Sequence, residues 1–285
     1  MATCYRHPNR ETGVSCSSCG RAICPDCMTP TPVGMRCPEC AKQKTQVRNI
    51  SSVGRSTDTN VTIGLIIVNV VLFIASGQFS FGGASTTSLF NDFALAAGPI
   101  AVNDEYYRLV TGGFLHAGLL HIGFNMYLLW VLGQMLEPAL GSLRFGLLYA
   151  VSLLAGSAGA LLTADWNTPT VGASGAVFGL MGVAFFEMRA RGIDPWQSGI
   201  GPLILFNLVL SFVLSNISIG GHIGGLIGGS IAALVLQQVD RRRLGQAAAI
   251  AVLAVLAIGS AAGGFAAATG KCDADTLCSQ IKSAS

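Results

Sequence analysis

The sequence has little charge. Only 11% of its 285 residues are charged and 51% are hydrophobic, whereas about 25% of residues are charged in an ordinary soluble domain. No Asp, Glu, Lys or Arg occurs from Pro195 to Val239. This shortage argues against a soluble protein and predicts a membrane protein. We expect no secretory signal peptide, because the first residues are polar. We also expect no nucleic-acid partner, because the net charge is only +3 and the basic residues form no single patch.

Seven apolar stretches follow residue 60, and we expect each to form a membrane-spanning helix. Several are shorter than the ~20 residues that a spanning helix needs, so their ends extend into the flanking loops. The expected organisation is a small module at 1–41, a polar linker at 42–60, a six-helix core at 61–240, and a seventh span with an external tail at 241–285. The stretches are 61–78, 120–136, 144–163, 174–188, 200–214, 220–237 and 246–268.

The basic residues predict the orientation of these spans. If the N-terminus is cytosolic, 14 of the 17 Lys and Arg lie on the cytosolic side, as the positive-inside rule requires. We therefore expect a multi-pass protein, of the plasma membrane, with a cytosolic N-terminus and an external C-terminal tail. Cys272 and Cys278 then lie outside, where a disulfide between them fits the compartment. The cytosolic set comprises eight basic residues in the first 60 plus Arg144, Arg189, Arg191, Arg241, Arg242 and Arg243.

Seven of the nine cysteines lie before residue 41 and form a metal-ligand pattern with His7. Two residues separate the members of each pair, which lets a tight turn aim both side chains at one ion. Eight ligands make two closed structural zinc sites, and zinc would supply the folding energy that so short a module lacks. The alternative is a disulfide framework, which needs an oxidising compartment. The pairs are Cys4 with His7, Cys16 with Cys19, Cys24 with Cys27, and Cys37 with Cys40.

This N-terminal segment resembles a B-box-type zinc finger with interleaved ligands. The resemblance implies that Cys4, His7, Cys24 and Cys27 hold one ion, and that Cys16, Cys19, Cys37 and Cys40 hold the other. The spacing alone also allows sequential pairing. Modules of this type usually bind proteins, so the resemblance implies a cytosolic protein partner.

Polar residues inside the predicted spans are the candidates for chemistry, because such residues are expensive in lipid. His121 and Asn125 share one face near the start of the second span, just after His116. Ser174 opens the fourth span and His222 lies near the start of the sixth. The predicted topology brings all of them to the external side. Glycines at small-xxx-small spacing on spans four and six favour close helix packing.

These motifs resemble those of rhomboid intramembrane proteases over about residues 61–240. The matching features are Gly-x-Ser-Gly ending at Gly175, His222 followed by xxGxxxG, the histidines and asparagine of span two, and Tyr107-Arg108 in the first external loop. The resemblance implies that Ser174 is a nucleophile with His222 as its general base, and that no third acid is needed. It also implies an oxyanion site formed by His121, Asn125 and the Ser174 backbone N–H. Substrates would be transmembrane helices that enter past the fifth span.

Each of these residues also has a plainer interpretation. Ser174 could be a small residue at a helix interface, His222, His121 and Asn125 interhelical hydrogen-bonding groups, and Arg108 a side chain that snorkels to the membrane surface. An α/β-hydrolase elbow does not fit, because Ala176 replaces its last glycine. Metallo- and aspartyl intramembrane proteases do not fit either, because His-Glu-x-x-His and paired acids inside the spans are missing. The remaining alternatives are an inactive rhomboid-like protein that binds membrane clients, and a transporter.

Overall fold

The structure is a computed structural model that describes residues 2–31, 34–42, 59–81, 87–213 and 217–284. The chain forms two compact units, Met1–Gly54 and Arg55–Ser285. The predicted linker at 42–60 lies almost wholly outside the described residues, and only its ends at 42, 59 and 60 are seen.

The described residues of the N-terminal unit form two short hairpins and two short helical turns. Strand β1 (Ala2–Thr3) pairs with β2 (Glu11–Thr12), and β3 (Thr29–Thr31) pairs with β4 (Gly34–Arg36), both antiparallel. The 3-10 turn η1 (Pro25–Cys27) and helix α1 (Pro38–Lys42) complete the unit. Its buried cluster consists of six cysteines and Ile23. A unit with so little apolar interior needs a further source of stability.

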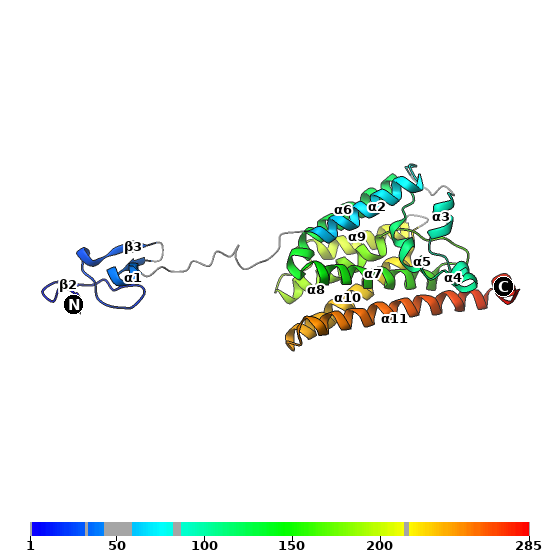
Figure 1. Cartoon of the computed structure of the whole chain (residues 1–285). Coiled ribbons are helices and arrows are strands. Elements are labelled where there is room, and N and C mark those ends of the chain that lie inside the picture. Colours follow the sequence, from blue (N-terminus) through cyan, green and yellow to red (C-terminus); the bar gives the residue numbers. More distant parts are fainter. Residues whose placement is uncertain (1, 32–33, 43–58, 82–86, 214–216, 285) are drawn as a thin grey trace. The chain divides into compact units, whose positions relative to one another are not determined.

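The membrane unit contains a helix for each of the seven predicted spans (Figure 1). Among the described residues, α6, α7, α10 and α11 are long and apolar enough to cross a membrane, and α2 and α9 are shorter apolar helices. The grouping of six helices into a core with one added helix stays a prediction. The bounds are α2 (Asn60–Ser76), α6 (Leu119–Leu140), α7 (Ser142–Thr163), α8 (Ser174–Ala190), α9 (Ile200–Val213), α10 (Ile219–Arg241) and α11 (Gly245–Ala274).

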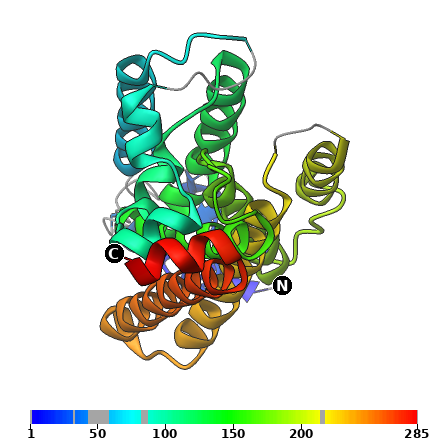
Figure 2. The ribbon, with the colours of Figure 1, turned by 90° about the vertical axis from the view of Figure 1, so that its right-hand side faces the viewer.

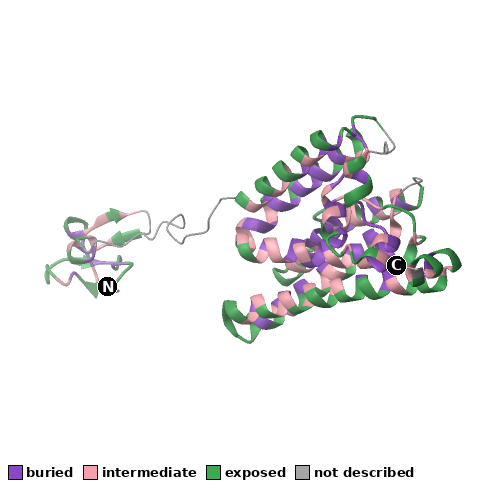
Figure 3. Ribbon diagram, turned by 45° about the vertical axis from the view of Figure 1, so that its right-hand side comes forward, coloured by how far each residue is buried: buried purple, intermediate pink, exposed green. Residues whose placement is uncertain are grey.

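Helix α7 is at the centre of this unit and packs against α8, α10 and α11. Helices α2 and α6 lie together on one side, α11 lies on the opposite side, and α9 stands at the edge (Figure 2). The outward faces of α2 and α11 are largely exposed (Figure 3). The exposed large apolar side chains of these helices include Val71, Ile74, Val255 and Ile258. Apolar side chains exposed in bands along outer helices are suited to contact with lipid.

In the part of the chain that the structure describes, five short helices, which the hydropathy pattern does not predict, lie outside the seven long ones. They are α3 (Ser88–Phe93), α4 (Ala97–Asn103), α5 (Arg108–Thr111) and η3 (Gly112–Phe114) before α6, and α12 (Thr276–Ala284) after α11. A disulfide joins Cys272 and Cys278 and packs with Ala101 of α4. The C-terminal end of the chain is thereby held against the loop that precedes α6.

The sequence motifs lead us to expect no acid in spans two, four and six, and this expectation is wrong, because α6, α8 and α10 each contain one. Glu137 and Asp240 lie in α6 and α10 because these helices run further than the predicted spans 120–136 and 220–237, whereas Glu187 of α8 already lies inside the predicted span 174–188. Glu137 is 1% exposed and its carboxylate accepts hydrogen bonds from the backbone N–H groups of Val61 and Thr62, at 2.9 and 2.8 Å. These bonds satisfy two of the free N–H groups at the start of α2 and join it to the end of α6.

Candidate active site and metal centre

Ser174 is the first residue of α8 and is half-buried. The preceding loop is held by backbone hydrogen bonds between Leu95 and Thr170, and between Gly172 N–H and Gly112 C=O at 3.0 Å. Gly172 has a φ of +129°, a conformation that favours glycine. The loop therefore presents Ser174 at a helix N-terminus, where the partial positive charge of the helix dipole favours a developing anion.

His222 lies in the first turn of α10 and packs against α8 near the serine. Its imidazole stacks on the ring of Phe178, with centroids 4.1 Å apart and an interplanar angle of 18°. Phe178 is one helical turn after Ser174, about 6 Å along α8. Within the described part of the chain no hydrogen bond joins Ser174 to His222. Catalytic hydrogen bonds are often long in proteins without substrate and tighten when it binds.

Glycines let α8 and α10 approach backbone to backbone. A Cβ atom on Gly225 would lie 1.9 Å from the carbonyl oxygen of Gly175, and one on Gly229 would lie 2.2 Å from that of Gly179. No side chain larger than hydrogen fits at either place without separating the helices. These are the four glycines that the small-xxx-small pattern singles out, and their contacts hold the start of α10 beside the start of α8.

His121 lies beside Ser174 across Gly172. A Cβ atom built on Gly172 would be 2.7 Å from His121 Nε2 and 3.6 Å from Ser174 Oγ. The side chains of His121 and Ser174 therefore both lie next to the space that this Cβ would fill. Asn125 is buried, and its side-chain amide donates to the backbone carbonyl of His121 at 2.9 Å. The structure thus brings His121 to the serine, and Asn125 lies one turn further along α6.

His116 is fully buried behind these residues. Its ring meets that of His121 edge-on, with centroids 5.0 Å apart, and its Nε2 accepts from the backbone N–H of Ala173 at 3.5 Å. His116 thereby contacts both the loop before Ser174 and the imidazole of His121.

Arg108 is buried instead of snorkelling to the surface. Its Nη1 donates to the carbonyl oxygens of Asn91 and Ala94, at 2.7 and 2.8 Å, and its guanidinium pairs with Glu105. Burial raises the pKa of Glu105, but hydrogen bonds from Arg108 and Tyr107 outweigh it and hold that pKa below the ordinary carboxyl value. Arg108 therefore ties together the loop that precedes α6.

The three acids of α6, α8 and α10 lie at the helix ends remote from this site. Asp240 follows His222 by 18 residues, about 27 Å along α10, and Glu137 follows His121 by 16 residues, about 24 Å along α6. Asp240 is instead paired with Arg144 at 2.9 Å. These acids are therefore too far away to orient His222 as the aspartate of a catalytic triad does.

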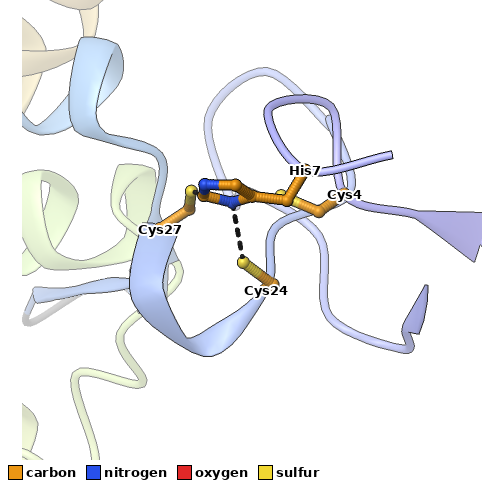
Figure 4. A group of neighbouring side chains, drawn as sticks. All are labelled: Cys4, His7, Cys24 and Cys27. Atoms are coloured by element: carbon orange, nitrogen blue, oxygen red, sulfur yellow. Dashed lines mark hydrogen bonds between the residues drawn. The ribbon is translucent and has the colours of Figure 1, made fainter. Parts of the chain in front are cut away.

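The N-terminal unit contains two groups of four ligands. Cys4, His7, Cys24 and Cys27 form one group, and Cys16, Cys19, Cys37 and Cys40 form the other, with ligand atoms within 4.8 Å of one another. Figure 4 shows the first group converging, with His7 Nδ1 3.3 Å from Cys24 Sγ and 3.4 Å from Cys27 Sγ. This is the interleaved arrangement, and all seven cysteines are free thiols. Both groups could hold a metal ion, and thiolate and imidazole donors in fours suit zinc.

Comparisons with known proteins agree with the geometry of the membrane unit. Residues 103–239 match the family model of the rhomboid domain, a range that contains His116, His121, Asn125, Ser174 and His222. The chain is 33% identical over 225 residues to rhomboid protease GluP of Bacillus subtilis, covering 76% of this chain and 43% of that protein. It is 40% identical over 119 residues to putative rhomboid protease YdcA of the same organism, covering 41% of this chain and 60% of that protein.

A plant relative extends the comparison. RHOMBOID-like protein 6, mitochondrial, of Arabidopsis thaliana is 33% identical over 142 residues, covering 49% of this chain and 44% of that protein. The chain thus spans between about two fifths and three fifths of the length of these three relatives. The matches and the apolar helices support a multi-pass membrane protein of the rhomboid family.

Proposed function

We propose that this protein is an intramembrane serine endopeptidase that cleaves transmembrane helices by a Ser174–His222 dyad. The observation that carries the proposal is the packing of α10 on α8, which stacks His222 on Phe178 one turn from Ser174. The rhomboid protease relatives support the same reaction class. Zinc takes no part in this reaction, and the N-terminal sites are proposed to hold two structural ions.

The dyad accounts for the protons of the reaction. Ser174 Oγ attacks the carbonyl carbon of the scissile peptide while its proton moves to His222, which becomes an imidazolium. When the tetrahedral intermediate collapses, the C–N bond breaks and the imidazolium gives that proton to the leaving amine. Water then hydrolyses the acyl-enzyme, with His222 again acting as base.

The oxyanion formed in the attack needs hydrogen-bond donors. We propose His121, Asn125 and the Ser174 backbone N–H for this role, because His121 flanks Ser174 across Gly172. Removing one such donor costs roughly 3 kcal/mol of transition-state stabilisation in comparable sites. One N–H of the Asn125 amide donates to the His121 carbonyl in this structure, so its second N–H is the one proposed for the oxyanion.

The proposed substrate enters from the lipid past α9, at the edge of the unit, and the N-terminus is proposed to face the cytosol. Four basic residues lie near the helix ends remote from Ser174 and His222: Arg144 at the start of α7, Arg189 near the end of α8, and Arg241 and Arg242 at the end of α10. This distribution supports an external active site. Protease protection of the N-terminal unit in sealed inverted vesicles tests the orientation, and protection there would contradict it.

The reaction is tested with a fluorophosphonate probe on the full chain in detergent, followed by cleavage of a transmembrane substrate in proteoliposomes. We expect labelling and cleavage in the wild type and neither in Ser174→Ala or His222→Ala, with all three proteins equally folded. Persistent labelling of Ser174→Ala would remove Ser174 as nucleophile. No labelling of folded wild type would favour the inactive client-binding protein.

A further inference from the structure

Ser211 makes a direct hydrogen bond to the proposed catalytic base. Its Oγ lies 2.6 Å from Nδ1 of His222, and the two residues are 2% and 7% exposed. Ser211 belongs to α9, so this bond joins the edge helix to α10. The motifs that identify the dyad do not include it, since they lie on α6, α8 and α10.

The direction of this bond follows from the hydrogens available. A serine hydroxyl carries one hydrogen, and Ser211 Oγ already donates to the backbone carbonyl of Asn207 at 2.7 Å. Its remaining capacity is as an acceptor, so the hydrogen between Ser211 and His222 belongs to Nδ1. With one proton on the neutral ring, Nε2 then carries the free lone pair.

We propose that Ser211 is a positioning residue that holds His222 as the Nδ1–H tautomer and leaves Nε2 free to accept the Ser174 proton. This inference rests on the proposed function. The stacked Phe178 ring sets the plane of the imidazole, and the Ser211 bond sets its rotation within that plane. Both restraints act on the ring without touching the substrate.

A hydroxyl suits this position better than a carboxylate. In a catalytic triad an aspartate accepts from Nδ1, but an ionised carboxylate is costly to bury in a membrane site. Ser211 is neutral in the resting protein. It can also go on accepting from Nδ1 after His222 becomes an imidazolium, while its own hydrogen remains on the Asn207 carbonyl. The acids of α8 and α10, Glu187 and Asp240, lie near the opposite ends of those helices.

Steady-state cleavage in proteoliposomes tests the role of the hydroxyl. We expect Ser211→Ala to lower kcat about ten- to a hundredfold, the range for loss of a hydrogen bond to a charged group, with KM little changed. Ser211→Thr retains the hydroxyl and should recover most of the rate. The matched control is Ser152→Ala on α7, since Ser152 is also buried and bonds its own helix at 2.7 Å. A full rate in Ser211→Ala, or equal loss in a folded Ser211→Thr, would overturn the proposal.

The tautomer itself can be measured without turnover. The chain has four histidines, so ¹⁵N imidazole spectra of the labelled full chain in detergent can be assigned, with His222→Ala identifying the signal of interest. We expect the Nδ1–H tautomer in the wild type and a mixture in Ser211→Ala. A wild-type Nε2–H tautomer, or an unchanged spectrum in Ser211→Ala, would refute the role of Ser211. Because Ser174→Ala tests the dyad separately, failure of one proposal is distinguishable from failure of the other.

Discussion

The contact between Gly225 and Gly175 leads to the strongest prediction. Gly225→Ala places a methyl 1.9 Å from the Gly175 carbonyl oxygen and 2.7 Å from its carbonyl carbon. An ordinary carbon–oxygen contact is about 3.3 Å, so α10 must move away from α8 by roughly 1.4 Å. The opposing atoms are backbone and cannot rotate aside. Overpacking costs typically 1–3 kcal/mol, and we expect about 3 kcal/mol here because the two helices must separate as whole units.

The same displacement acts on the proposed dyad, because Gly175 directly follows Ser174 and Gly225 is three residues after His222. A misplacement of about 1 Å can lower a rate roughly a hundredfold. We therefore expect Gly225→Ala to lower both the Tm in detergent and the rate of fluorophosphonate labelling. The control is Gly259→Ala on α11, where a Cβ would meet nothing within 4 Å. There the better helix propensity of alanine should leave Tm equal or higher. Equal Tm and labelling rate in the two variants would refute the close-packing argument.

Three further predictions concern parts of the chain outside the dyad. A strong chelator should remove two zinc ions per chain and unfold residues 2–42, while fluorophosphonate labelling of the membrane unit continues. Mass spectrometry that finds fewer than two zinc ions per chain would contradict the two-site proposal. Glu137→Gln should lower the free energy of unfolding by about 2 kcal/mol, because the NH₂ group of glutamine cannot accept from Thr62 as the carboxylate does. An unchanged Tm in this variant would contradict the role of Glu137. The pKa of Glu105 is lowered, so its contribution to stability is present above the ordinary carboxyl pKa and is lost as pH falls through the lowered value. Arg108→Met should abolish that acid-dependent part of Tm, and an unchanged pH profile would contradict the pairing.

Much of the membrane unit can be predicted from the sequence, because lipid leaves the backbone few choices. A helix occurs in every predicted apolar stretch. Ser174 and His222 could be placed near the starts of helices, because each lies where a more polar segment of the sequence gives way to an apolar stretch. Their close approach could be expected from the glycine spacing, since only small residues let two backbones meet.

Glu137 was missed because its role depends on a partner 75 residues away. A glutamate just past an apolar stretch is expected to lie in the cytosolic loop. Only the pairing of α2 with α6 shows that it accepts from Val61 and Thr62. The short helices α3 to α5 were missed for a similar reason. Each is only four to seven residues long, which is too short for a periodic pattern, and they are held by long-range bonds such as that from Arg108 to Asn91.

Ser211 shows the limit of motif-based reasoning most clearly. A serine in an apolar helix usually bonds its own preceding turn, and Ser211 does so with Asn207. Taken alone, that bond suggests a satisfied side chain with no further role. The structure adds that the same oxygen lies 2.6 Å from Nδ1 of His222. Because the hydroxyl hydrogen is already donated to Asn207, Ser211 accepts the hydrogen bond from His222. A motif identifies the residues that react, whereas the group that selects the tautomer of the base is found only by accounting for each hydrogen in the folded protein.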